Sequence, residues 1–190
     1  MKLMDGQVLY HGSYSAVKAV DLAKCAKGKD FGCGFYMTTD REQARSFIPQ
    51  SIRKAKALGR IPQEQTYGYL SVFRYHQIEP IQQYAFETTD AKWLQFVAGN
   101  RLGCFETFSA REEMLAIASS DMIGGKIADD NTNRQLAAYI DGVFGALDDE
   151  EAIRLAVRRL KPENLKDQWC FLTEAALRCL TFVEADRYDF

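Results

Sequence analysis

The spacing of apolar and polar residues predicts short strands near both ends of the chain, with helices between them. Residues 8–11 and 35–38 are brief apolar runs, and residues 67–75 alternate and are rich in aromatic and β-branched side chains. All three segments are typical of strands. Towards the C-terminus we expect three further strands, at residues 120–128 with a bulge at Gly124-Gly125, at residues 167–172 and at residues 181–184.

Helical periodicity follows several of these strands. Apolar residues recur three and four positions apart after Asp40, so a helix capped by Thr39 or Asp40 is predicted, and Pro49 is expected to kink or end it. Further helical segments are expected near residues 20–24, at 91–97 with an end at Gly99, after the capping sequence 130–132, at 148–160 and at 174–180. This order predicts an α+β fold in a single domain, residues 1–190, with a helical insertion at about residues 130–162.

Size and charge narrow the class of protein. The chain has 190 residues, 47% of them hydrophobic, which suits one sizeable core. Its net charge of −2 predicts no broad electrostatic attraction to nucleic acid or to an anionic membrane. Five scattered cysteines and only two histidines argue against a metal site. The N-terminus lacks the apolar core of a signal peptide and no apolar run could span a membrane, so we expect a cytoplasmic protein, or one delivered into the cytoplasm of a target cell.

Two short motifs combine glycine with a polar or aromatic side chain. His11-Gly12-Ser13 ends the first strand, where a histidine can bind a ribose hydroxyl and a glycine lets the backbone approach a flat carboxamide. The turn that ends at Gly34 precedes Tyr36, whose ring can stack on a planar ligand. Each motif also has a purely structural interpretation, as a strand end with its turn or as an ordinary core aromatic.

A third motif is the strand at residues 167–172. Alternation places Gln168, Cys170 and Leu172 on one face, and Trp169 and Phe171 on the other. Gln168 is thus a single polar residue on an apolar face. Its amide can donate and accept at once, as a pair of ribose hydroxyls requires. The structural interpretation is an edge-strand glutamine that points into water.

The order and separation of the three motifs resemble those of the diphtheria-toxin-like and poly-ADP-ribose-polymerase-like ADP-ribosyltransferases. Over nearly its whole length the chain is more closely similar to a bacterial family, domain of unknown function 3990 (DUF3990), in His-Gly-Ser, Asp-Phe-Gly-x-Gly-Phe-Tyr, Trp-Leu-x-Phe-Val, Asp-Asp-Asn-Thr and a late Asp-Gln. The resemblance implies a split pair of antiparallel sheets surrounded by helices. It also implies NAD, as substrate, in the cleft between the sheets, and no metal.

The resemblance assigns roles residue by residue. The catalytic residues would be His11, which holds a ribose, Tyr36, which stacks on nicotinamide, and Gln168. Gly12 would clamp the carboxamide through its backbone. The NAD-binding set implied in this way is His11, Gly12, Ser13, Gly34, Tyr36 and Phe47, the last as a second stacking ring. Ala44 stands where the polymerases have a serine, so one bond to the carboxamide is lost.

Gln168 stands where the family pattern has glutamate. A neutral amide cannot act as a base, although it can hold the ribose 2′-hydroxyl and orient the bond to be broken. Asp129, Asp130, Glu163 and Asp167 are the acids that could substitute, but Asp130 is expected to cap a helix and Asp167 to face away from Gln168. By resemblance, Glu163 or Asn164 would contact the acceptor.

The resemblance therefore implies a mono-ADP-ribosyltransferase that passes ADP-ribose from NAD to a macromolecule, protein or nucleic acid. Small bacterial enzymes of this type are often toxins, which would imply an antitoxin or immunity partner. Two other functions stay open. One is NAD hydrolysis with water as acceptor. The other is an inactive NAD-binding or protein-interaction module, which the missing glutamate favours.

Overall fold

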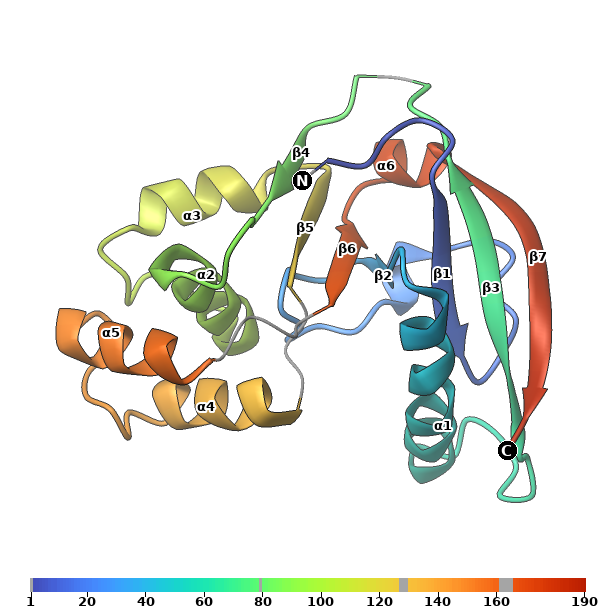
Figure 1. The fold of residues 1–190 in the computed structure, drawn as a ribbon, viewed down its shortest axis with the longest axis horizontal. Helices are drawn as coiled ribbons and strands as arrows, with labels where there is room; N and C mark the ends of the chain where they lie inside the picture. Colours follow the sequence, from blue (N-terminus) through green and yellow to red (C-terminus); the bar gives the residue numbers. More distant parts are fainter. Residues whose placement is uncertain (1, 79, 127–129, 161–165) are drawn as a thin grey trace.

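Two β-sheets form the centre of the molecule (Figure 1). The computed structural model describes residues 2–78, 80–126, 130–160 and 166–190. One sheet has the order β1-β3-β7, with strands β1 (Val8–Ser13), β3 (Tyr67–Tyr75) and β7 (Leu180–Asp189). The other has the order β2-β6-β5-β4, with strands β2 (Phe35–Met37), β6 (Asp167–Phe171), β5 (Met122–Lys126) and β4 (Gln83–Ala85). Neighbouring strands are antiparallel except for the parallel pair β4–β5.

Helices pack against both sheets, which confirms the α+β prediction. Helix α1 (Arg41–Ala57) packs on the first sheet. On the side of the second sheet lie α2 (Ala91–Leu102), α3 (Arg111–Ala118), α4 (Asp130–Ile140) and α5 (Glu150–Arg159). A 3-10 helix (Leu22–Lys24) follows β1, and α6 (Glu174–Arg178) joins β6 to β7. In the described part of the chain, no helix is both long and apolar enough to cross a membrane.

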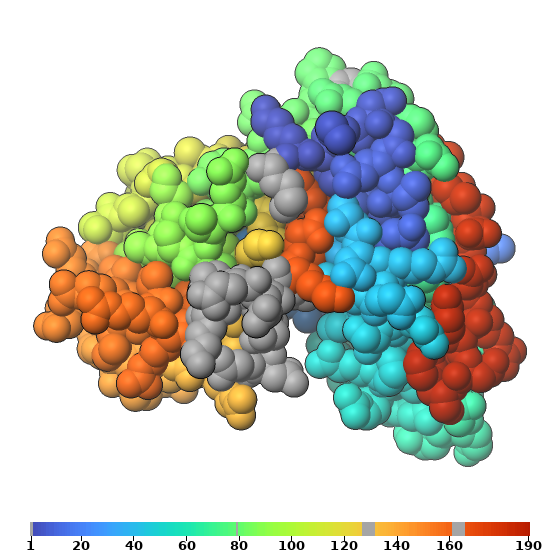
Figure 2. All heavy atoms as spheres, viewed as in Figure 1, coloured from blue at the N-terminus to red at the C-terminus, as the bar shows by residue number. Residues whose placement is uncertain are grey.

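Strand alternation divides the core into layers. Trp169 and Phe171 of β6 face the first sheet, and Cys170 between them faces the helices. This is the alternation that the sequence predicts for β6. In Figure 2 the helical side and the side of the first sheet form two parts of one surface, and orange-red atoms from the β6 region reach the surface between them. The start of β6 therefore lies at the junction of the two parts.

The helix end predicted at Gly99 is wrong, and of the two outcomes expected at Pro49, a kink or a helix end, the structure excludes the end. Helix α1 begins after the cap Asp40 but continues through Pro49 to Ala57. Proline removes one hydrogen bond there, and its φ remains compatible with a helix. Helix α2 passes Gly99 and ends at Gly103, which adopts a left-handed φ of 71°. Gly99 is instead a packing position, because an added Cβ would overlap the ring of Phe105.

Several strand predictions also need correction. The ladder between β5 and β6 is regular, so Gly124 and Gly125 form no bulge. These two positions require glycine because an added Cβ would overlap the indole of Trp169 at Gly124 and the ring of Phe31 at Gly125. The last strand is longer than predicted, because β7 pairs along the whole of β3. Strand β4 and helix α3 were not predicted; β4 has only three residues and depends on its pairing with β5.

Candidate functional site

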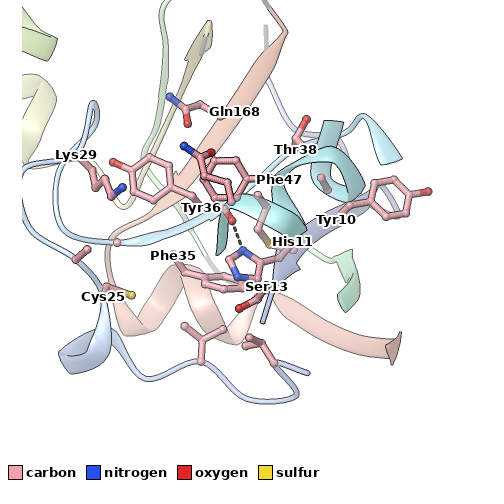
Figure 3. Close-up of a pocket in the computed structure, with 18 of the residues that line it drawn as sticks. Tyr10, His11, Ser13, Cys25, Lys29, Phe35, Tyr36, Thr38, Phe47 and Gln168 are labelled. Atoms are coloured by element: carbon pink, nitrogen blue, oxygen red, sulfur yellow. Dashed lines mark hydrogen bonds between the residues drawn. The ribbon is translucent and has the colours of Figure 1, made fainter. Parts of the chain in front are cut away.

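A pocket of about 1150 Å³ opens where β1, β2, β6 and α1 meet (Figure 3). Its lining includes every residue of the predicted NAD site: His11, Gly12, Ser13, Gly34, Tyr36, Phe47 and Gln168. The three motifs therefore converge although they lie far apart in the sequence. The predicted acceptor residues Glu163 and Asn164, like Asp129, lie outside the described residues.

The floor of the pocket is the point where the two sheets separate. Tyr10 and Thr38 form an isolated bridge, with N–H to carbonyl distances of 2.9 and 3.1 Å. Backbone groups alternate between the two edges of a strand, so Gly12 directs its N–H and C=O to the same edge as Tyr10. Beyond the bridge, the described residues of β1 and β2 pair no further, and the pocket occupies that space. The backbone of Gly12 thus offers one donor and one acceptor to a ligand.

Glycines are required here by close packing. An added Cβ at Gly12 would overlap the backbone carbonyl of Ala44 in α1. An added Cβ at Gly34 would overlap the carbonyl of Phe171 and the thiol of Cys170 in β6. Both glycines therefore bring the walls of the pocket together. Ala44, the position without a hydroxyl, is itself buried in the wall.

His11 joins the first sheet to the second. Its Nδ1 lies 2.8 Å from the carbonyl oxygen of Tyr36, and its ring packs on Phe35 with 4.5 Å between the ring centroids. A carbonyl only accepts, so Nδ1 carries the proton, and in the neutral ring Nε2 is then an acceptor. Burial lowers the pKa of His11, and the bond to Tyr36 opposes this only in part. The neutral imidazole can accept a bond from a hydroxyl group.

This lowered pKa predicts a loss of stability in acid. The unfolded chain takes up a proton at His11 near pH 6.5, whereas the folded chain does so at lower pH. Stability should therefore fall as the pH drops below 6.5, by up to about 1.4 kcal/mol per pH unit from this group. Urea unfolding of the wild type and His11→Asn at several pH values measures the difference. His76→Gln, the change at the other histidine, serves as control; parallel curves for the wild type and His11→Asn would exclude this effect.

The hydroxyl of Tyr36 is used within the fold. It accepts a hydrogen bond from the N–H of Phe31 at 2.9 Å and donates one to the carbonyl of Gly32 at 2.8 Å. Burial raises the pKa of Tyr36 far above its usual value. The hydroxyl therefore closes the glycine turn and carries no proton for chemistry. What Tyr36 can offer a ligand is its ring.

Tyr36→Phe should consequently lower the free energy of unfolding by about 1–3 kcal/mol, because it leaves a buried N–H and a carbonyl without partners. Thermal unfolding measures this, with Tyr69→Phe on β3 as control. Unchanged stability in Tyr36→Phe would show that the turn does not depend on the hydroxyl.

Gln168 has a carboxylate partner that the sequence analysis missed. Its Nε2 donates to Oδ2 of Asp30 at 3.3 Å, and both side chains are buried. Oδ1 of Asp30 accepts from Nε and Nη2 of Arg101 at 2.9 and 2.6 Å. Nη2 of Arg101 also donates to Asn133 at 2.7 Å. A chain of hydrogen bonds thus connects Gln168 to helices α2 and α4.

Asp30 lies directly before the glycine turn that leads into β2. This position next to a motif of the site was the sequence signal that could have identified Asp30 as a functional residue. Arg101 and Asn133 carry no such signal, because each lies outside the motif of its own helix, Trp-Leu-x-Phe-Val in α2 and Asp-Asp-Asn-Thr at the start of α4. Asp167, in contrast, was correctly expected to face away from Gln168. Its carboxylate accepts from the hydroxyl of Thr39, at 3.0 and 2.9 Å to its two oxygens.

The pocket also carries positive charge. Most of its cationic side chains are paired with a carboxylate: Lys24 with Asp21, Arg101 with Asp30 and Lys166 with Asp40. Lys29 also lines the pocket, and the described residues place no carboxylate within ion-pair distance of it. Burial and the nearby charge of Lys54 lower the pKa of Lys29. Among the lining residues that the structure describes, Lys29 is therefore the cation without a carboxylate partner, which makes it available to an anionic ligand.

No group of three or more His, Cys, Asp or Glu side chains is arranged to hold a metal ion in the regions that the structure describes. The chemistry available in the pocket consists of an aromatic surface, the Gly12 backbone, an imidazole acceptor, an amide and a lysine.

Comparison with known proteins adds one finding. No curated protein and no solved structure matches the chain. A family model described as protein of unknown function (DUF3990) matches residues 7–182, which include all three motifs of the pocket. Because the match covers nearly the whole sequence, the chain belongs to the DUF3990 family.

Proposed function

We propose that the pocket binds NAD and that the protein is a mono-ADP-ribosyltransferase. The observation that carries this proposal is the convergence of His11, Tyr36 and Gln168, from three different strands, on one pocket. Each brings a group that suits one part of the nicotinamide riboside. A single strand-end histidine or core tyrosine would not support the same conclusion.

The nicotinamide end fits the floor of the pocket. A carboxamide has one donor face and one acceptor face, which match the C=O and N–H of Gly12. The ring would lie against Tyr36, with Phe47 as the second wall. Phe47 is 46% exposed on α1 although it is a large aromatic residue. Such exposure is expected for a ring that a bound ligand would cover.

The ribose and diphosphate fit the remaining groups. Nε2 of His11 and the amide of Gln168 can hold ribose hydroxyls and so fix the orientation of the bond to nicotinamide. Lys29 can pair with the diphosphate. In the reaction, the bond between ribose C1′ and the nicotinamide nitrogen breaks and its electron pair leaves with nicotinamide. C1′ then bonds to the acceptor, whose proton goes to solvent. Because Gln168 is no base, the acceptor must already be a good nucleophile, and chain elongation is not expected.

The test uses NAD labelled on its ADP-ribose part, incubated with the purified protein and a cell lysate. We expect free nicotinamide together with labelled macromolecules. Nicotinamide release with only free ADP-ribose would make the protein an NAD glycohydrolase. Absence of release, with or without NAD binding, would contradict the enzyme proposal.

Phe47→Ala should weaken NAD binding by roughly 5- to 150-fold, because an aromatic stacking contact contributes roughly 1–3 kcal/mol. Stability should change little, since the ring is 46% exposed. Calorimetric titration with NAD measures the affinity. Phe47→Tyr should retain it, and Leu58→Ala, an exposed apolar residue at the end of the same helix, is the control. Equal affinity for Phe47→Ala and wild type would remove Phe47 from the site.

A further inference from the structure

The position of the Gln168 backbone is fixed by the second sheet. Gln168 lies in β6 opposite Gly125 of β5, and its side chain is 7% exposed. Figure 3 shows this side chain beside Tyr36 in the pocket. The remaining freedom is the orientation of the terminal amide, which can be turned so that its oxygen and its NH2 group exchange places. What the amide presents to a ligand depends on this orientation.

Asp30 determines the orientation of the Gln168 amide. Oδ1 of Asp30 is occupied by two donors of Arg101, which leaves Oδ2 facing Gln168. An ionised carboxylate has no proton to donate, so only the NH2 group of the amide can face it. With Nε2 bound to Asp30, Oε1 is directed away from the carboxylate. The described residues supply no donor to Oε1, and Gln168 lines the pocket.

We propose that Asp30 is a positioning residue that holds Gln168 with its amide oxygen towards the ligand. The pocket then presents a hydrogen-bond acceptor at the position where the glutamate of the family pattern would present a carboxylate oxygen. The effect of this orientation on turnover rests on the proposed NAD chemistry, in which the amide oxygen of Gln168 accepts a hydrogen bond from a ribose hydroxyl. The orientation itself does not depend on that function.

The exchange of donor and acceptor provides the experiment. In Asp30→Asn the amide oxygen stays on Arg101 and the NH2 group faces Gln168, so the Gln168 amide turns and presents its NH2 group to the pocket. In the double variant Asp30→Asn/Gln168→Glu, the new carboxylate accepts from that NH2 group and again offers an oxygen. In Gln168→Glu alone, two carboxylates lie side by side and repel each other.

The effect of Asp30→Asn on the rate of nicotinamide release should therefore have opposite signs in the wild-type and the Gln168→Glu backgrounds. Asp30→Asn should lower kcat by about tenfold in the wild-type background, the equivalent of losing one net hydrogen bond in the transition state. The same substitution should raise kcat in the Gln168→Glu background. A merely structural role of Asp30 predicts a loss in both backgrounds, and that result would overturn the proposal. Asp167→Asn, the same change on the opposite face of β6, is the control. Thermal unfolding of all variants separates activity from folding.

A second readout needs no activity. The side-chain amide signals of Gln168 in nitrogen-15 NMR spectra, assigned by their loss in Gln168→Glu, should shift in Asp30→Asn and stay in place in Asp167→Asn. Unshifted signals in Asp30→Asn would overturn the proposal. Shifted signals in a protein that releases no nicotinamide would support the orientation and contradict the enzyme function.

Discussion

Arg101→Met should lower the free energy of unfolding by about 3–5 kcal/mol, the range for breaking a buried ion pair by removing one partner. The side chains of Arg101 and Asp30 are only 24% and 12% exposed. Without the guanidinium, the carboxylate of Asp30 would remain in the pocket wall with Gln168 as its one described side-chain partner. The contact between α2 and the loop before β2 would weaken, so NAD binding should fall together with stability.

Urea unfolding measures the loss. The double variant Arg101→Met/Asp30→Asn should recover part of it, because the remaining partner is then neutral. The control is Arg154→Met, since the Arg154–Glu151 pair is 61% and 83% exposed and such pairs contribute at most about 1 kcal/mol. Similar losses in Arg101→Met and Arg154→Met would show that the buried network does not stabilise the fold.

Gly12→Ala should destabilise the protein by about 3 kcal/mol or more and abolish NAD binding. The added methyl group would overlap the carbonyl of Ala44, a backbone atom that moves only if α1 moves away from β1. Helix α1 carries Phe47, so a displacement opens the pocket as well as the core.

Gly103→Ala is the matched control for this steric effect. Gly103 has no atom within 4 Å of an added Cβ but a φ of 71°, so alanine there meets only backbone strain, about 1 kcal/mol. Thermal unfolding and NAD titration of both variants test the difference. Equal effects of the two substitutions would show that the approach of α1 to Gly12 is not close.

Local patterns predicted most of the elements that carry the site. Strand alternation placed Gln168 on the face opposite Asp167, and the strand before His11 and the helix after Asp40 begin where their polar and apolar residues indicate. Glycines were harder to interpret. Gly99 and Gly124 were assigned to a helix end and a bulge, because a glycine required by a neighbouring ring has the same local sequence as one required by a turn.

The contact between Gln168 and Asp30 could not be predicted, since it joins residues 138 positions apart. No local pattern indicates that the loop before β2 will lie beside β6. Arg101 fixes that loop from α2, and the pairing of β2 with β6 follows from packing of the whole molecule. The long β7 likewise depends on β3 for its extent.

The most direct test of the account is a crystal structure of the protein with NAD or nicotinamide. The account predicts the nicotinamide ring between Tyr36 and Phe47, its carboxamide on the backbone N–H and C=O of Gly12, and the adjoining ribose between His11 and the amide oxygen of Gln168. A pocket that stays empty in crystals grown with saturating NAD, or NAD bound elsewhere on the molecule, would contradict it.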